Sequence, residues 1–199
     1  MLKDREQNKA IIFFSKELNL IPRRDIRKYI ESELNKLPDY FWVVPSSSTG
    51  KYHPEYTNGV SGLTRHTKAL VYTFFEMCRN ETFVNKEDLE SLGINLDTFI
   101  SLGVGAGLLH DGYKYGLVKG EYTTKDHPII MANKLKEGYN GQIPLNEFNL
   151  LYQAIASHMG QWNTGYNGEE LMPKPSNILD KMVHLGDYIA SRKNIEVKL

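Results

Sequence analysis

Apolar residues recur along most of this chain at spacings of three and four positions, which is the period of an amphipathic helix. The N-terminal stretch, for example, carries Ile11, Phe14 and Leu18 at this spacing. The same pattern predicts helices over residues 3–20, 22–37, 64–78, 86–92, 96–110, 127–136, 147–158 and 177–192. No internal repeat and no convincing pair of strands interrupts the series, so we expect an all-α fold.

The segments between the predicted helices contain typical capping residues and two long loops. Residues that often cap helix N-termini stand at Asp126, Asn146 and Ser176. Residues 40–62 and 160–175 lack a helical period and are rich in Gly, Pro and small polar residues. We expect both to be loops, the first with a short extended piece at 41–44. Loops this long are uncommon in compact domains and are often functional.

The length of the chain suits one domain with a substantial core. We interpret residues 1–37 as an N-terminal helical extension, 38–62 as a loop that reaches the functional site, and 63–199 as the main helical domain. Together they are expected to form a single compact domain. The extension either packs on the main domain or forms a homodimer interface.

Composition narrows the class of protein. Among 199 residues, Lys and Arg total 24 and so do Asp and Glu, which gives a formal net charge of zero. A neutral chain is a poor candidate for extended nucleic-acid binding, although a few local cations suffice for a small phosphorylated ligand. The single cysteine, Cys78, excludes an internal disulfide framework and a cysteine-based zinc site. We find no signal peptide and no apolar run of about 18 residues, so we expect a cytoplasmic protein without membrane contact.

Several histidines and carboxylates fall where the helical pattern predicts burial. His158 continues the apolar stripe of its helix, and Asp187 lies in an otherwise apolar helix. His110 and Asp111 end the most apolar helix of the chain. A buried carboxylate is costly unless it is paired or bound to a metal. Because imidazole and carboxylate groups ligate Mn²⁺, Fe²⁺, Zn²⁺ and Mg²⁺, the pattern indicates one inner metal centre.

In their order along the chain, these residues resemble the H…HD…H…H…D pattern of the HD-domain superfamily, an all-α family of mostly metal-dependent phosphohydrolases. The resemblance spans about residues 61–192 and lies in four segments: "GLTRHT" around His66, "LLHDGYK" around His110 and Asp111, "DHPIIMANKL" around His127, and "HLGDYIASR" around Asp187. The second segment is similar to the HD-x-x-K form of HD-GYP cyclic-dinucleotide phosphodiesterases and of diadenosine-tetraphosphate hydrolases. The Gly-Tyr-Pro element of the HD-GYP proteins does not follow it.

The resemblance implies an HD-domain helical bundle around two divalent ions, which could be Mn, Fe, Zn or Mg. The ligands that it implies for one ion are His66, His110, Asp111 and Asp187. The ligands that it implies for the other ion are Asp111, His127 and His158, so that Asp111 bridges the two. Ions held in this way activate a water for attack on phosphorus, which gives Asp111 a catalytic role.

The function implied is that of a metal-dependent phosphohydrolase or phosphodiesterase acting on a nucleotide-type phosphate ester or diester. A di-iron HD-type oxygenase is one alternative, because a minority of the superfamily uses the same ligand set for chemistry with O₂. A noncatalytic HD binding module is another, although such modules typically have lost ligands. Lys114, in the HD-x-x-K form, favours the hydrolase.

Other residues are candidates for contact with phosphate. Lys114 follows the His-Asp pair by one helical turn, which puts it either near a phosphate oxygen or on the solvated surface. The segment "SSSTGKYHP" either folds over the metal site or is a simple connection, and in the first case His53 is a candidate general acid. The candidate substrate-binding residues are then Ser47, Ser48, Thr49, Lys51, Arg65 and Lys114.

Three aromatic residues near the last two ligands complete the candidates. Trp162 and Tyr166, in the loop after His158, either stack on a base or are surface aromatics. His184 lies one helical turn before Asp187 and is either a partner of a ligand or a structural residue.

Overall fold

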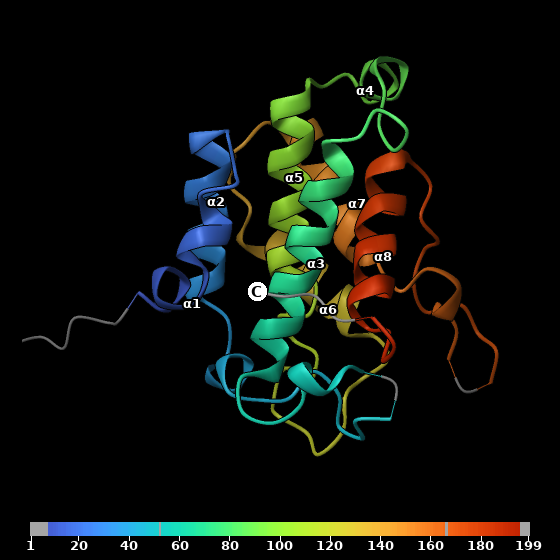
Figure 1. Ribbon diagram of the computed structural model, residues 1–199. Coiled ribbons are helices and arrows are strands. Elements are labelled where there is room, and N and C mark those ends of the chain that lie inside the picture. The colour runs from blue at the N-terminus through green and yellow to red at the C-terminus, as the bar shows by residue number, and fades with distance from the viewer. Residues whose placement is uncertain (1–7, 52, 166, 196–199) are drawn as a thin grey trace, which may run out of the picture.

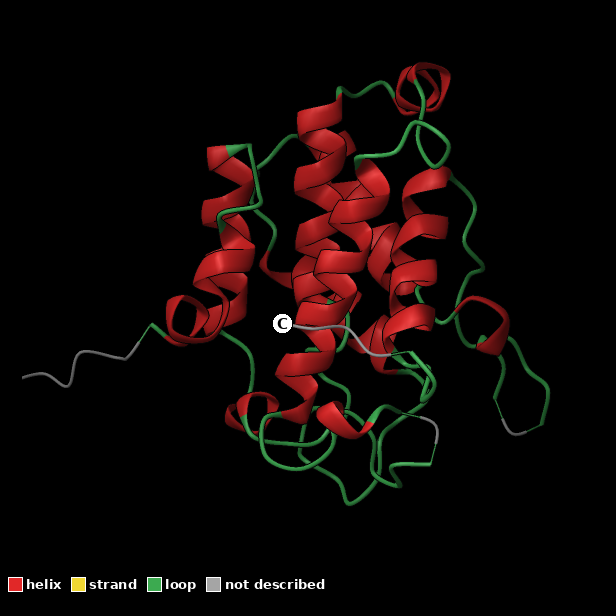
Figure 2. Ribbon diagram, in the orientation of Figure 1, coloured by secondary structure: helices red, strands yellow, loops and turns green. Residues whose placement is uncertain are grey.

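The computed structural model describes residues 8–51, 53–165 and 167–195, and in these ranges the chain is all-helical (Figures 1 and 2). The predicted all-α class is confirmed. The α-helices in the described ranges are α1 (Lys9–Leu18), α2 (Arg24–Asn35), α3 (Gly62–Cys78), α4 (Lys86–Leu92), α5 (Leu96–Leu109), α6 (His127–Gly138), α7 (Leu145–Ala156) and α8 (Ile178–Ala190). Three short 3₁₀ helices accompany them, at Asp39–Trp42, Glu55–Thr57 and Gly160–Trp162.

Helix α5 is the central element, and α2, α3, α7 and α8 pack around it (Figure 1). Almost all of its side chains are buried, which matches its apolar sequence. Glycines let the neighbouring helices approach closely, since a Cβ atom at Gly103 would lie 1.8 Å from the Phe74 ring. One at Gly107 would lie 2.5 Å from the Leu70 side chain.

No single helix in the described ranges is long and apolar enough to cross a membrane. Helices α4 and α5 meet the length and composition requirement only when they are taken together, and a bend of 74° separates them.

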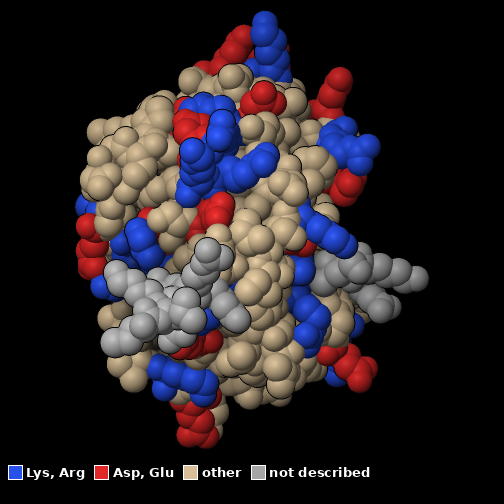
Figure 3. Space-filling model, turned by 90° about the vertical axis from the view of Figure 1, so that its left-hand side faces the viewer, with Lys and Arg blue, Asp and Glu red and all other residues tan. Residues whose placement is uncertain are grey.

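The N-terminal pair of helices packs against this core. Helix α2 lies against α5, and α1 lies against α2 and α3. Arg23, at the start of α2, hydrogen-bonds Thr98 of α5 and pairs with Glu147 of α7 at 3.1 Å. On the face that carries α1 and α2, basic and acidic side chains are interspersed (Figure 3). The extension therefore packs on the main domain through these contacts, whereas a homodimer stays a prediction.

Three details of the helix ends differ from the sequence prediction. Helix α7 is preceded by Pro144 and not by a capping Asn146. Helix α8 is capped by Asn177, whose side chain accepts a hydrogen bond from the Asp180 N–H, and not by Ser176. Asp126 does precede α6, but its side chain makes no capping hydrogen bond. Prolines stand at the starts of α6 (Pro128) and α7 (Pro144), which suits them because proline has no backbone N–H that needs a hydrogen-bond partner.

The loop of residues 38–62 lies at one end of the bundle, below the start of α3 in Figure 1. The prediction of an extended piece at 41–44 is wrong, because residues 39–42 form a turn of 3₁₀ helix. The side chains of Phe41 and Trp42 in this turn are buried. Hydrogen bonds tie this loop to the turn after α5: the Tyr40 hydroxyl donates to the Gly116 carbonyl, and the Tyr115 hydroxyl donates to the Pro45 carbonyl. The loop is thus anchored beside the end of α5, where the candidate ligands lie.

Candidate metal centre

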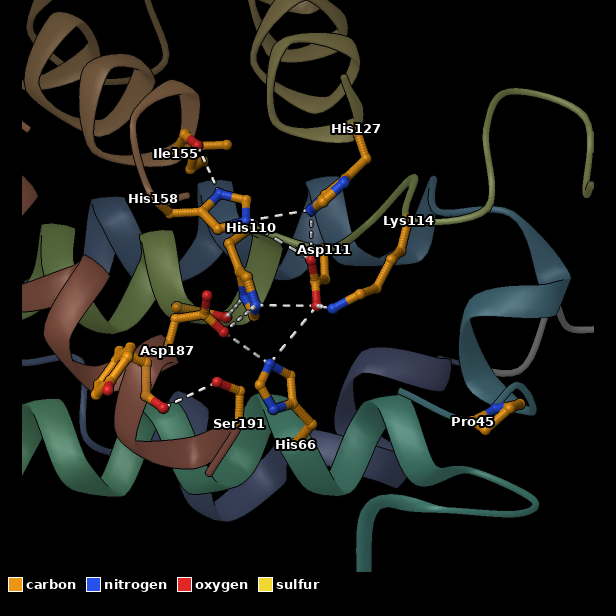
Figure 4. A network of polar contacts seen from close by, with 12 residues as sticks. Pro45, His66, His110, Asp111, Lys114, His127, Ile155, His158, Asp187 and Ser191 are labelled. Atoms are coloured by element: carbon orange, nitrogen blue, oxygen red, sulfur yellow. Dashed lines mark hydrogen bonds and ion pairs between the residues drawn. The ribbon is translucent and has the colours of Figure 1, made fainter. Parts of the chain in front are cut away.

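Six histidine and aspartate side chains from five parts of the fold meet at the loop-bearing end of the bundle, pointing toward a common centre (Figure 4). His66 comes from the second turn of α3, His110 and Asp111 directly follow α5, and Asp187 lies in the last turns of α8. The remaining two are His127, the first residue of α6, and His158, two residues after α7. All six are the residues that the sequence pattern singled out, and the fold brings them together.

One group of contacts surrounds Oδ2 of Asp111. His110 Nε2 lies 3.1 Å and His66 Nε2 lies 3.6 Å from this oxygen. Asp187 Oδ1 lies 2.9 Å from His66 Nε2 and 3.7 Å from His110 Nε2, so the two carboxylates flank the two rings. His66, His110 and Asp111 offer ligand atoms that all lie within 4.8 Å of one another. This spacing suits ligands about 2.0–2.2 Å from a shared ion.

A second group surrounds the other oxygen of the same carboxylate. His127 Nε2 lies 2.9 Å and His158 Nε2 lies 3.7 Å from Asp111 Oδ1, and the two nitrogens are 3.2 Å apart. These three residues also offer ligand atoms within 4.8 Å of one another. Asp111 belongs to both groups, which is the arrangement that a bridging carboxylate requires.

Backbone carbonyls fix the orientation of three of the rings. In His110, His127 and His158, Nδ1 lies 2.7, 2.6 and 2.8 Å from the carbonyl oxygen of the residue three positions earlier. Each Nδ1–H donates to that oxygen, so the other nitrogen, Nε2, is aimed at Asp111 and carries no proton when the ring is neutral. A metal-ligating histidine is typically held in this way, by a hydrogen bond from its other ring nitrogen.

The electrostatics of the cluster favour the metal-binding protonation states of Asp111, His66 and His158, whereas His110 is shifted toward its protonated form. Burial alone would raise the pKa of Asp111, but the neighbouring His110 and Lys114 hold it well below its usual value. Burial lowers the pKa of His66, and lowers that of His158 to about 3 with help from His110 and His127. The pKa of His110 is raised, because Asp111 outweighs the effect of burial. At neutral pH the shared carboxylate is therefore ionised, and His66 and His158 are neutral.

Buried polar atoms that lack partners show that the residues fit a metal. His66 Nε2, His110 Nε2 and Asp111 Oδ1 are buried and make no hydrogen bond within the described part of the chain. Their neighbours are at ion-pair distance, but the geometry is not that of a hydrogen bond. Leaving such atoms buried and unsatisfied costs about 1–3 kcal/mol each. Divalent ions at the two oxygens of Asp111 would accept lone pairs from these atoms, so the donor set suits metal ions.

A cleft of about 680 Å³ opens beside the cluster, and His127 and Asp187 form part of its lining. Lys114 lies at its edge and reaches Asp111 Oδ2 through an ion pair, with only 12% of its side chain exposed. His53 also lines the cleft, with its ring centroid 5.4 Å from that of His66. Burial, together with Lys114 and His66, lowers the pKa of His53 to about 3, so the free protein holds this ring neutral. General-acid catalysis by His53 stays a prediction.

Among the described residues of the loop 38–62, only His53 lines the cleft. The other candidates for phosphate contact from this loop, and Arg65, are not part of the cleft lining. Ser47 uses its hydroxyl within the loop, where Oγ accepts hydrogen bonds from the Thr49 and Gly50 N–H groups. Lys51 is exposed. Ser48 is half-buried. Arg65 donates to three carbonyls of the loop, those of Tyr56, Asn58 and Val60. These contacts assign Arg65 to holding the loop against α3, and phosphate binding by this group of residues stays a prediction.

The cleft also contains residues that the sequence did not single out. Tyr188 lies on α8 directly after Asp187, Arg192 lies two residues beyond the end of α8, and Lys125 lies just before α6. Tyr188 follows His184 by four residues on the same face of α8, and this spacing could have indicated it. Trp162 lines the cleft, whereas Tyr166 lies outside the described residues.

His184 supports the turn that carries a ligand. Its Nδ1 donates to the backbone carbonyl of His158 at 2.7 Å, and its ring lies against Gly160 and near Trp162. Gly160 has a φ of +59°, and a Cβ there would lie 2.2 Å from the His184 ring. The turn therefore needs glycine at this position.

Comparison with known proteins does not add to this picture. No family model, no curated protein and no solved structure matches the chain. What is established is an all-helical fold with a buried histidine–aspartate cluster that could hold metal ions.

Proposed function

We propose that this chain is a metal-dependent phosphohydrolase of the HD superfamily, acting on phosphate esters or diesters of the nucleotide type. The observation that carries the proposal is the shared carboxylate of Asp111, with two histidines beside each oxygen and a lysine paired to it. The sequence order of the six residues, which resembles that of the superfamily, supports the same assignment.

In this proposal two divalent ions occupy the two groups of ligands. His66, His110, Asp111 and Asp187 hold one ion, and Asp111, His127 and His158 hold the other. When bound, such ions supply Lewis acidity and lower the pKa of a water at the site. Nitrogen and carboxylate donors of this kind suit Mn²⁺, Fe²⁺, Zn²⁺ and Mg²⁺.

The remaining side chains orient the phosphorylated substrate. Lys114 places a positive charge at the edge of the cleft, next to the shared carboxylate, where it can contact a phosphoryl oxygen. His53 lies on the same side and, as a neutral ring, offers one N–H to the substrate. During hydrolysis the oxygen of a water molecule bonds to phosphorus, the bond between phosphorus and the ester oxygen breaks, and the ester oxygen leaves with a proton that the water gives up. Lys114 and His53, which both line the cleft, can stabilise the negative charge on the leaving oxygen.

Hydrolysis of bis-p-nitrophenyl phosphate, beside p-nitrophenyl phosphate, tests the proposal. We expect release of nitrophenolate that requires Mn²⁺ and stops when EDTA is added. Asp111→Asn should lower kcat/KM by about 1000-fold or more, because it removes the ligand common to both ions. Asp97→Asn, an exposed carboxylate on the same helix, should stay within about twofold of wild type. Activity that survives EDTA or Asp111→Asn would contradict the proposal.

Lys114→Gln gives a finer test of the phosphate contact. Because it removes a charge without removing a metal ligand, we expect kcat/KM to fall about 10- to 100-fold while the metal content stays unchanged. Lys134→Gln, a lysine on the surface of α6 in an ion pair with Glu137, is the matched control and should leave activity unchanged. Loss of bound metal in Lys114→Gln would instead assign Lys114 a structural role.

The same donor set also suits a di-iron oxygenase, which the experiment separates from the hydrolase. Protein loaded with two Fe²⁺ that consumes O₂ in the presence of a substrate, and hydrolyses neither nitrophenyl ester with Mn²⁺, would favour the oxygenase.

A further inference from the structure

Part of the cleft lining, which begins next to the candidate ligand Asp187, is aromatic. Two aromatic rings stack there, with the centroids of Trp162 and Tyr188 5.7 Å apart and their planes at 10°. The guanidinium of Arg192 lies 4.4 Å from the centroid of the Tyr188 ring and 5.7 Å from that of Trp162. Trp162 nonetheless remains 44% exposed, so part of this large apolar ring faces solvent. Planar rings next to an arginine form a surface on which nucleic-acid bases stack.

This aromatic wall is connected to the metal centre. Tyr188 directly follows Asp187 near the end of α8, and Arg192 lies two residues beyond that helix. On the other side, Trp162 ends the short 3₁₀ helix that follows His158. The hydrogen bond from His184 to the His158 carbonyl joins this turn to α8. Both rings are therefore close to candidate ligands along the chain, with Tyr188 next to Asp187 and Trp162 four residues after His158.

The charge of the cleft favours an anion between the wall and the ligands. The described lining contains the cations Lys114, Lys125 and Arg192 but only one carboxylate, that of Asp187. Thr123 and Thr124 lie on the same lining. The positive balance is local, because the whole chain has a formal net charge of zero. A ligand with a phosphate at one end and a flat ring at the other matches these two features.

We infer that Trp162, Tyr188 and Arg192 form a subsite that binds the base of a nucleotide substrate, with the exposed ring of Trp162 as the stacking surface. The inference rests on the proposed function, because it places the phosphate at the metal centre of the same cleft. It assigns Trp162 the role of selecting nucleotides over sugar phosphates that lack a base.

Binding of two matched phosphonates to the full-length, Mn²⁺-loaded protein tests the subsite. One is the phosphonate analogue of AMP, whose P–C bond resists hydrolysis, and the other is ribose with the same phosphonate group and no base. By isothermal titration calorimetry we expect the nucleotide analogue to bind at least about tenfold more tightly. It should also quench the fluorescence of Trp162, which is exposed, whereas the second tryptophan, Trp42, is buried in the core.

Variants separate stacking from a general effect on the cleft. Trp162→Ala should lower the affinity for the nucleotide analogue about tenfold and leave the affinity for the base-free analogue unchanged. Trp162→Phe should retain most of the affinity for the nucleotide analogue. Circular dichroism of each variant checks the fold. Equal affinity of the wild type for the two analogues, no binding of either, or an equal loss for both in Trp162→Ala would overturn the inference.

The outcomes also distinguish this inference from the proposed hydrolysis. Mn²⁺-dependent hydrolysis of nitrophenyl esters without discrimination between the analogues would leave the hydrolase and remove the subsite. Discrimination without any hydrolysis would leave the subsite and remove the reaction.

Discussion

The two halves of the candidate metal centre are built differently, although they share Asp111. The half at Oδ2 has four candidate ligands, and all of them belong to or directly follow long helices that pack on one another. The half at Oδ1 has three, and its own ligands are His127, the first residue of α6, and His158, in the turn after α7. The first half therefore includes two residues inside core helices, His66 and Asp187, whereas the second has candidate ligands only at helix ends. We expect the second half to lose its ion more easily.

Removing the shared ligand should have the largest effect and abolish the difference between the halves. Asp111→Asn leaves each group with a neutral amide in place of the carboxylate. After dialysis against metal-free buffer we expect the content of Mn²⁺ to fall from about two ions per chain to about 0.2 or fewer, measured by mass spectrometry of the metals. Asp97→Asn should keep the wild-type content, and retention of both ions by Asp111→Asn would refute the bridging role.

Removing one histidine from each half should reveal the asymmetry. His127→Ala leaves two ligands at Oδ1, so we expect this half to lose its ion and the chain to keep one. His66→Ala leaves three ligands at Oδ2, so we expect that ion to stay bound with about 100-fold lower affinity. Calorimetric titration with Mn²⁺ measures both. Two tight ions in His127→Ala would show that the ligands are divided differently.

The smallest expected effect tests the turn that supports the second half. Gly160→Ala forces a positive φ on alanine and pushes a methyl group against the ring of His184. We expect a loss of about 2–3 kcal/mol in the free energy of unfolding, seen as a fall in Tm of about 5–10 °C. Gly168→Ala has a φ of +82° but nothing within 4 Å of the new Cβ, so strain alone should cost about 1 kcal/mol. Equal falls in Tm would show that contact with His184 contributes nothing.

The sequence predicted the fold and the cluster better than it predicted the cleft. Helices with a strong apolar period, such as α5, were found because the period of burial is written directly in the sequence. The six ligands stand out for a related reason, since a charged or imidazole group in an apolar helix needs a partner. Helix starts were less certain, as Asn146 and Ser176 show, because several neighbouring residues can cap equally well.

The loops show where sequence reasoning stops. The residues 41–44 read as extended because they are aromatic and β-branched, but burial of Phe41 and Trp42 against α1 favours a 3₁₀ turn. The role of Arg65 in holding the loop depends on three carbonyls brought close by folding, which no local pattern reveals. The same holds for the stack of Trp162 on Tyr188, which joins a loop to a helix.

Electron paramagnetic resonance of the wild-type protein loaded with two equivalents of Mn²⁺ tests the central claim most directly. If Asp111 bridges two ions, their spins couple, and we expect the spectrum of an exchange-coupled pair. His127→Ala should convert it to the six-line spectrum of a single Mn²⁺. A six-line spectrum from the wild-type protein at two ions per chain, or the absence of bound Mn²⁺, would contradict a two-metal centre built on Asp111.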